Sequence, residues 1–482
     1  MSGKKSVSLN AALNVLKQIC AVIFPMITFP YVSRVLGAEI YGKINFSSSI
    51  ISYISLIAAL GITSYAIREC AGVKNDPVLF KKKVNELFSI NLSTTVVSYI
   101  VLIGLLLFWP KLKGYEAILL IQSVYVIFTT IGTDWINVIY EDYAYITIRY
   151  LICQSIAVLS TFILVRNEGD YLLYAVVSIL GSVLANICNF FYIRKKLGVK
   201  PRFIINMNIR EHYKPILILF GSAVASLIYI NSDVTILGIL KDDTEVGYYS
   251  VSAKIYGLVK QIINAALMVF LPRISKEVGS VSRKQIETRF SKLINILLIF
   301  IAPACAGLFM LSKNIVLLFS GMDYISAYSS LRLLAFSLPF ASLACFYINI
   351  VMIPYKMEKK VLIATSVSAV LNIVLNIIFI PMWGQDAAAG TTLLAEVVML
   401  VSGIIFTRKI ISIKIYKGLL CAFIETVGTG LLCYLCLNII DGVVLQIIVS
   451  IAFAAVFCGA VAVAMFSKDL KGLLKKDNYS KE

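Results

Sequence analysis

The sequence is poor in charged residues and has a single histidine. Of its 482 residues only 15% are Asp, Glu, Lys or Arg, whereas 59% are hydrophobic. A soluble protein needs more polar surface to cover its core, so this composition excludes an ordinary soluble globular protein. The sequence has one histidine, His212. No Ser-His-Asp or Cys-His set for nucleophilic catalysis accompanies it. We expect it to be a solvated residue of a basic loop.

Motifs for metal, redox or nucleotide chemistry are incomplete. Cys433 and Cys436 form a C-x-x-C pair inside an apolar run, but no second pair accompanies them, so packing is their expected role. The segment from Gly37 to Lys43 reads G-x-x-x-x-G-K, as in a phosphate-binding loop, yet Ile44 replaces the Ser or Thr and no strand precedes it. We therefore expect no metal site, no catalytic residues and no built-in ATPase.

Apolar runs are what the sequence has in abundance. Many are about 18 residues or longer, enough to cross roughly 30 Å of hydrocarbon as a helix. The sequence therefore predicts an all-α polytopic membrane protein with fourteen transmembrane helices. The expected spans lie near 11–35, 44–66, 84–109, 115–139, 146–165, 171–193, 215–240, 246–271, 290–311, 327–353, 361–381, 387–407, 416–438 and 443–466.

The net charge of +18 is explained by membrane topology rather than by nucleic-acid binding. Most Lys and Arg residues lie in alternate loops, above all between predicted helices two and three, six and seven, and eight and nine, and in the C-terminal tail. Loops rich in Lys and Arg stay on the cytoplasmic side, so both termini are predicted to be cytoplasmic. No nucleic-acid partner is expected.

A weak internal repeat divides the chain into two bundles. The pattern Gly37-x4-Gly42-x4-Ser47 is echoed by Gly247-x4-Ser252. Both bundles keep the same inside-outside order, which predicts a pseudo-two-fold axis along the membrane normal. The expected parts are an N-terminal six-helix bundle at 1–195, a cytoplasmic linker at 196–214, a C-terminal six-helix bundle at 215–410, two further helices at 411–466 and a basic cytoplasmic tail at 467–482.

Charged side chains inside the predicted helices indicate a polar cavity, because such charges are costly unless they face a partner or water. The cations at these positions are Lys17, Arg34, Lys254, Lys260 and Arg332. Their excess over acidic residues predicts a cationic cavity for an anionic ligand such as a diphosphate. Asp233 either pairs with a nearby lysine or carries H⁺ or Na⁺ for coupling.

Hydroxyl and amide side chains recur at helical spacing in several of these helices. Stripes are formed by Ser48, Ser52 and Ser55; by Gln122, Thr129, Thr133 and Asn137; by Ser222, Ser226 and Tyr229, continued by Asp233; and by Ser252, Tyr256 and Asn264, together with Lys260. Such residues either bond packed membrane helices to one another or line a cavity. The sequence leaves both roles open.

One segment resembles a known family. The run FPYVSRVLGAEIYGKINFSSSI, with Ser33 to Gly37 followed by Tyr41-Gly42, resembles the start of polysaccharide biosynthesis proteins of the Wzx flippase type, in the multidrug/oligosaccharidyl-lipid/polysaccharide exporter superfamily. The resemblance implies a bacterial inner-membrane protein that moves an undecaprenyl-diphosphate-linked oligosaccharide to the outer leaflet by alternating access. It places the family's basic motif residue at Arg34. It further implies membrane lipids and polysaccharide polymerase machinery as partners, and no cofactor besides H⁺ or Na⁺ coupling.

The expected function is therefore that of a flippase for O-antigen, capsule or a similar surface polymer, and not that of an enzyme. A multidrug exporter of the same fold is one alternative, although cationic drugs would favour acidic cavity residues, which this chain largely lacks. A membrane polysaccharide polymerase or ligase is another, although it would be expected to carry catalytic residues on a large outward loop. The outward loops predicted here are short.

Overall fold

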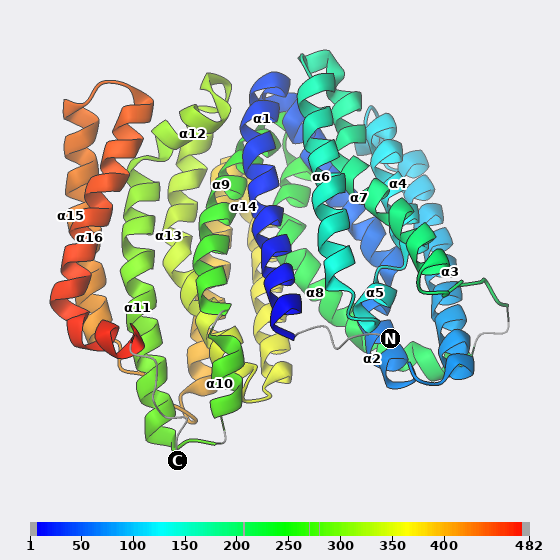
Figure 1. Cartoon of the computed structure of the whole chain (residues 1–482). Helices are drawn as coiled ribbons and strands as arrows, with labels where there is room; N and C mark the ends of the chain where they lie inside the picture. The colour runs from blue at the N-terminus through cyan, green and yellow to red at the C-terminus, as the bar shows by residue number, and fades with distance from the viewer. Residues whose placement is uncertain (1–6, 206–207, 269, 279, 475–482) are drawn as a thin grey trace. The chain divides into compact units, whose positions relative to one another are not determined.

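The computed structural model describes residues 7–205, 208–268, 270–278 and 280–474, and every regular element within these ranges is a helix (Figure 1). Eleven helices among the described residues are long and apolar enough to cross a membrane. This confirms the prediction of an all-α polytopic membrane protein. The number of fourteen crossings stays a prediction, since α9 (Asp243–Met268), on the expected span 246–271, is not among the eleven.

Two long helices each cover two of the expected spans, α14 in full and α1 except for the end of the span at 44–66. Helix α1 (Val7–Ala59) is interrupted at Gly37, and α14 (Glu358–Thr407) is interrupted at Gly384. Gly37 has φ 70° and ψ 171°, a backbone conformation that only glycine adopts without strain. The segment that looked like part of a phosphate-binding loop is therefore a bend within a membrane helix.

The chain divides into two compact units, an N-terminal unit (Met1–Gly247) and a C-terminal unit (Tyr248–Glu482). Besides α1, the N-terminal unit contains α2 (Ile62–Gly72), α3 (Pro77–Phe108), η1 (Pro110–Leu112), α4 (Glu116–Gly132), α5 (Trp135–Ile139), α6 (Tyr143–Leu164), η2 (Glu168–Asp170), α7 (Tyr171–Lys195), α8 (Ile209–Leu240) and the start of α9. Helix α4 packs on α7, α7 on α6, and α1 on α3, α4 and α6.

The C-terminal unit contains the rest of α9, then α10 (Leu271–Glu277), α11 (Arg283–Met310), α12 (Ser312–Ser320), η3 (Met322–Tyr324), α13 (Ala327–Cys345), a π-helical segment η4 (Phe346–Met352), α14, α15 (Tyr416–Ile439) and α16 (Val443–Leu474). Helix α13 packs on α14, and α11 packs on α13 and α15. The units divide inside α9, and the five-part division expected from the sequence stays a prediction.

Two glycines of the repeat pattern permit close packing of α1 against the start of α9. A side-chain carbon at Gly42 would lie 1.7 Å from the carbonyl oxygen of Asp243, and one at Gly247 would lie 2.0 Å from that of Ala38. Any larger residue at either position would push the backbones apart. Near this contact, the Tyr115 hydroxyl donates to Asp243 Oδ1 at 2.6 Å, and burial raises the pKa of that carboxyl.

Candidate functional site

A polar pocket of about 440 Å³ lies within the N-terminal unit, among α1, α4, α7 and α8. Its polar lining consists of Ser48, Ser52, Ser55, Gln122, Tyr125, Ser178 and Ser182, and none of its lining residues in the described chain is charged. The serine stripe of α1 therefore lines a cavity. Both roles that the sequence left open are present here, since Ser48 also joins α1 to α4 by accepting a hydrogen bond from Gln122.

One side chain in this pocket is incompletely hydrogen-bonded. Gln122 Nε2 donates to Ser48 Oγ at 2.9 Å, whereas the buried Gln122 Oε1 accepts no hydrogen bond within the described chain. A buried carbonyl oxygen without a donor costs about 1–3 kcal/mol, so a hydroxyl group from water or from a ligand would be stabilised there. Asn137, the last residue of the same predicted stripe, lies on α5 and acts differently, since it donates to Asn189 Oδ1 and so joins α5 to α7.

The predicted site residues of the N-terminal unit lie in different surroundings. Lys17 Nζ on α1 lies 5.6 Å from the centre of the Tyr150 ring of α6, as in a cation–π contact. Arg34, three residues before the bend at Gly37, is exposed. Asp233 on α8 is buried, with 7% of its surface exposed. Its predicted part in ion coupling or charge pairing stays a prediction.

In the C-terminal unit, two of the three predicted cations are held by neighbouring helices. Lys260 Nζ lies 2.6 Å from Oε1 of the buried Glu396 on α14. The charge of Lys260 is thus compensated inside the helix bundle. Arg332 on α13 donates through Nε to Ser312 Oγ at 3.0 Å, and its guanidinium lies 5.2 Å from the ring centre of Phe309.

Lys254, the third of these cations, differs from both. It is exposed on α9, and no hydrogen bond or ion pair joins its ammonium to another residue of the described chain. An ammonium in this state can bind a phosphate without first breaking an internal ion pair. The five predicted cations belong to both units, and their convergence on one cavity stays a prediction.

The C-terminal unit also has a groove of about 560 Å³ that the sequence did not predict. Its walls are mainly α11, α15 and α16, with apolar or small residues such as Phe300, Gly307, Ala455 and Ala462. Cys433 also lines it and is a buried free thiol. Within the described chain, no group of three or more His, Cys, Asp or Glu side chains could hold a metal ion. The groove can accept a long apolar chain.

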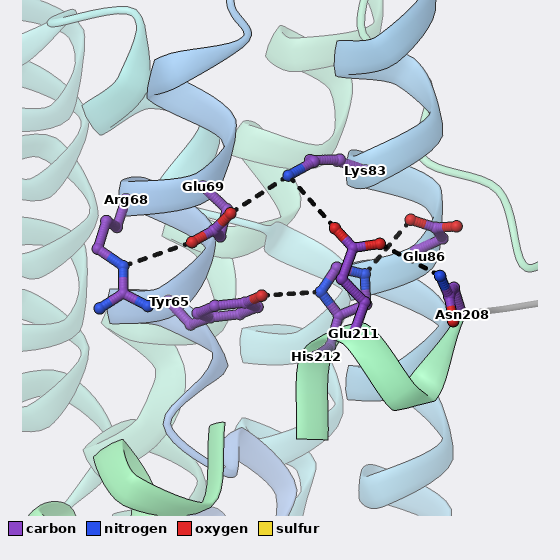
Figure 2. A network of polar contacts seen from close by, with 8 residues as sticks. All are labelled: Tyr65, Arg68, Glu69, Lys83, Glu86, Asn208, Glu211 and His212. Carbon is purple, nitrogen blue, oxygen red and sulfur yellow. Dashed lines mark hydrogen bonds and ion pairs between the residues drawn. The ribbon is translucent and has the colours of Figure 1, made fainter. Parts of the chain in front are cut away.

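The prediction for His212 is wrong, because this histidine is fully buried in the first turn of α8 (Figure 2). Its Nδ1 lies 2.9 Å from the Tyr65 hydroxyl of α2, and its Nε2 lies 3.3 Å from Glu86 Oε2 of α3. Both ring nitrogens thus have polar partners, which is what permits burial. These partners lie 147 and 126 residues away along the chain, so no local sequence pattern could reveal them.

Comparison with known proteins relates the chain to flippases. A family model described as polysaccharide biosynthesis protein matches residues 7–278, and a lipid II flippase MurJ family model matches residues 151–458. The "Putative O-antigen transporter" of Escherichia coli (strain K12) is 22% identical over 257 residues, 52% of this chain and 61% of that protein. The "Probable low-salt glycan biosynthesis flippase Agl15" of Haloferax volcanii is 24% identical, over 48% of this chain and 52% of its own length.

The chain thus spans less than two thirds of these two relatives. A solved structure, "Lipid II flippase MurJ, inward closed conformation", is 16% identical to this chain, with a TM-score of 0.74. The match covers 95% of this chain and 100% of that chain. At that identity the likeness shows the fold alone. The first family model, however, matches more than half of the chain, and it agrees with the resemblance around Arg34. The chain belongs to the polysaccharide biosynthesis protein family.

Proposed function

We propose that the protein is a flippase that moves an undecaprenyl-diphosphate-linked oligosaccharide across the bacterial cytoplasmic membrane for assembly of a surface polysaccharide. The observation that carries this proposal is the family match over residues 7–278, a range that includes the hydroxyl-lined pocket of the N-terminal unit. A transporter name given to one relative and a flippase name given to another support it.

The proposed substrate has three chemically different parts, and each suits a feature of the chain. Sugar hydroxyls suit the pocket of serines and Gln122, where donors and acceptors are present without charge. A diphosphate suits the exposed ammonium of Lys254, and we keep Lys17, Arg34, Lys260 and Arg332 as further proposed cations. The isoprenoid suits the apolar groove, because its chain can make dispersion contacts with the apolar walls in place of contacts with lipid tails.

Transport of this kind breaks no covalent bond, so the residues only need to bind and release. The cost lies in moving a charged sugar headgroup through hydrocarbon, and a polar path through the protein lowers that cost. We propose alternating access, with both termini in the cytoplasm and Asp233 as a candidate for H⁺ or Na⁺ coupling or for charge pairing. Membrane lipids and a polysaccharide polymerase are the proposed partners.

The test is reconstitution of the purified full chain into liposomes with a fluorescent undecaprenyl-diphosphate oligosaccharide. A membrane-impermeant quencher reports how much label lies in the outer leaflet. We expect label to cross with time, and Lys254→Ala to slow crossing while Lys409→Ala, which removes an exposed lysine after α14, leaves it unchanged. If the labelled lipid does not cross although the protein is correctly folded, the proposal is wrong. Movement of a cationic dye without movement of the lipid would indicate a multidrug exporter instead.

A further inference from the structure

A second pocket of the N-terminal unit, of about 360 Å³, is separate from the serine pocket. It lies where the first turns of α3 meet α5 and the segment after α7. Four of its lining residues are basic, namely Lys74, Lys81, Lys200 and Arg202, and none of its described lining residues is acidic. Four cations around one small volume repel one another, so an anion in that volume would be stabilised.

The basic side chains of this pocket are not balanced by carboxylates. Lys74 Nζ donates to the backbone oxygen of Ile139 at 2.9 Å and lies 4.9 Å from the ring centre of Tyr140. The side chains of Lys81, Lys200 and Arg202 form no ion pair with any described residue. Membrane topology accounts for basic residues in these loops, but it does not account for their gathering around a pocket without acidic partners.

Lys83, another basic residue of α3, shows the contrast. The side chain of Lys83 points toward the polar residues around His212. Its Nζ lies 3.2 Å from Glu69 Oε2 and 3.8 Å from Glu211 Oε1 (Figure 2). The chain therefore supplies carboxylates to balance Lys83 and supplies none to Lys81, two residues earlier. Carboxylates of α2 and α8 thus balance Lys83, whereas the pocket that Lys81 lines contains none.

The backbone holds the pocket in a fixed form. Gly198, at φ 69°, lets the chain turn after α7, and Val199 N donates back to Ile193 O at 2.9 Å. Arg202 N then donates to Asn85 Oδ1 on α3 at 2.9 Å. Because Asn85 accepts this bond through its oxygen, its amide NH₂ remains available as a neutral donor at the pocket wall. This hydrogen bond holds the segment with Lys200 and Arg202 against α3, which carries Lys81.

We propose that this pocket binds a phosphate-bearing anion, with the headgroup of an anionic membrane lipid as the ligand that fits it best. Lys81, Lys200 and Arg202 supply charge, and the Asn85 amide supplies a further donor. Phe80, Val84 and Tyr140 form an apolar wall that suits the glycerol and first methylenes of a lipid. The bound headgroup joins α3 to the segment before α8, and this role is independent of the transported substrate.

The test compares two double variants of the full chain that lose the same charge. Lys81→Gln/Arg202→Gln removes two pocket cations, and Lys82→Gln/Lys196→Gln removes two exposed lysines of the same regions that do not line the pocket. Each protein is titrated in detergent with phosphatidylglycerol, phosphatidylcholine or inorganic phosphate, and bound ligand is counted by native mass spectrometry. Thermal unfolding midpoints without ligand show that the variants fold.

We expect phosphatidylglycerol to bind the unchanged protein more tightly than phosphatidylcholine does. The pocket variant should bind it at least about tenfold more weakly, while the control variant changes by less than about twofold. If inorganic phosphate binds with the same dependence on Lys81 and Arg202, the site exists and its ligand is a soluble phosphate. Equal weakening in both variants, or no preference for the anionic lipid, would overturn the proposal.

Discussion

The pockets of the two units differ in polarity. The N-terminal unit lines a pocket with serines and leaves Gln122 Oε1 without a donor, so its polar groups are open to a ligand. The C-terminal unit closes Lys260 into an ion pair with Glu396 and offers an apolar groove. An amphipathic ligand needs both kinds of surface. The polar pocket suits the sugars of the proposed substrate, and the apolar groove suits its isoprenoid.

The largest effect is expected from breaking the ion pair of the C-terminal unit. Glu396→Leu leaves the ammonium of Lys260 without its partner, which should lower the free energy of unfolding by about 3 kcal/mol. The double variant Lys260→Met/Glu396→Leu should regain most of this loss, because no charge is then left unpaired. Denaturant unfolding in detergent measures both. Unchanged stability in the single variant would mean that Lys260 is free to bind substrate.

Filling the serine pocket should have the next largest effect. Ser52→Phe places a ring where we propose that sugars bind, and should slow lipid-linked oligosaccharide transport by roughly 10- to 100-fold. The matched control is Ser155→Phe, at an exposed serine of α6 that does not line the pocket. Liposome transport and the unfolding midpoint are measured for both. Equal slowing by the two variants would break the assignment of sugars to this pocket.

Filling the apolar groove should act on the lipid and not on the sugar. Ala455→Trp should slow transport of the full-length isoprenoid substrate by about tenfold, since much of the groove volume is lost. A substrate with a short isoprenoid should be affected less. Ala464→Trp, farther along α16 and outside the groove, is the control. Equal slowing of long and short substrates would remove the groove from the transport path.

The smallest effect is expected for Gln122→Leu. The change removes the hydrogen bond to Ser48 and also the unpaired buried oxygen, so the free energy of unfolding should change by less than about 1 kcal/mol. Transport should nevertheless fall about threefold, because a leucine offers no acceptor to a sugar hydroxyl. A large loss of stability with unchanged transport would show that Gln122 only joins α4 to α1.

Sequence reasoning predicted the fold well because membrane helices leave a direct signal. A run of about 20 apolar residues has few structures available in hydrocarbon other than a helix, so the spans could be placed from composition alone. The stripe of Ser48, Ser52 and Ser55 could likewise be placed on one face by helical spacing. Its role required the structure, because spacing along one helix does not say whether the facing helix is close or distant.

Contacts between distant segments could not be predicted from one sequence. Glu396 lies 136 residues from Lys260, and nothing near either residue indicates the other. His212 has basic neighbours in the sequence, Arg210 and Lys214, and its burial depends on Tyr65 and Glu86, which other helices supply. The apolar groove could not be predicted from the sequence either. A leucine or alanine that faces lipid, a neighbouring helix or a groove has the same character in the sequence.

The glycines of α1 carry a consequence for how this family can diversify. Gly37 is required by its backbone angles, and Gly42 by the contact with the backbone of Asp243. Neither requirement involves a ligand, so these two glycines fix the shape of the scaffold, whereas Arg34 of the same motif is a proposed substrate cation. We expect chains that carry different sugars to keep both glycines. Divergence in cargo is expected instead at the serines and at Gln122, where one substitution alters a hydrogen bond and leaves the bend of the helix intact.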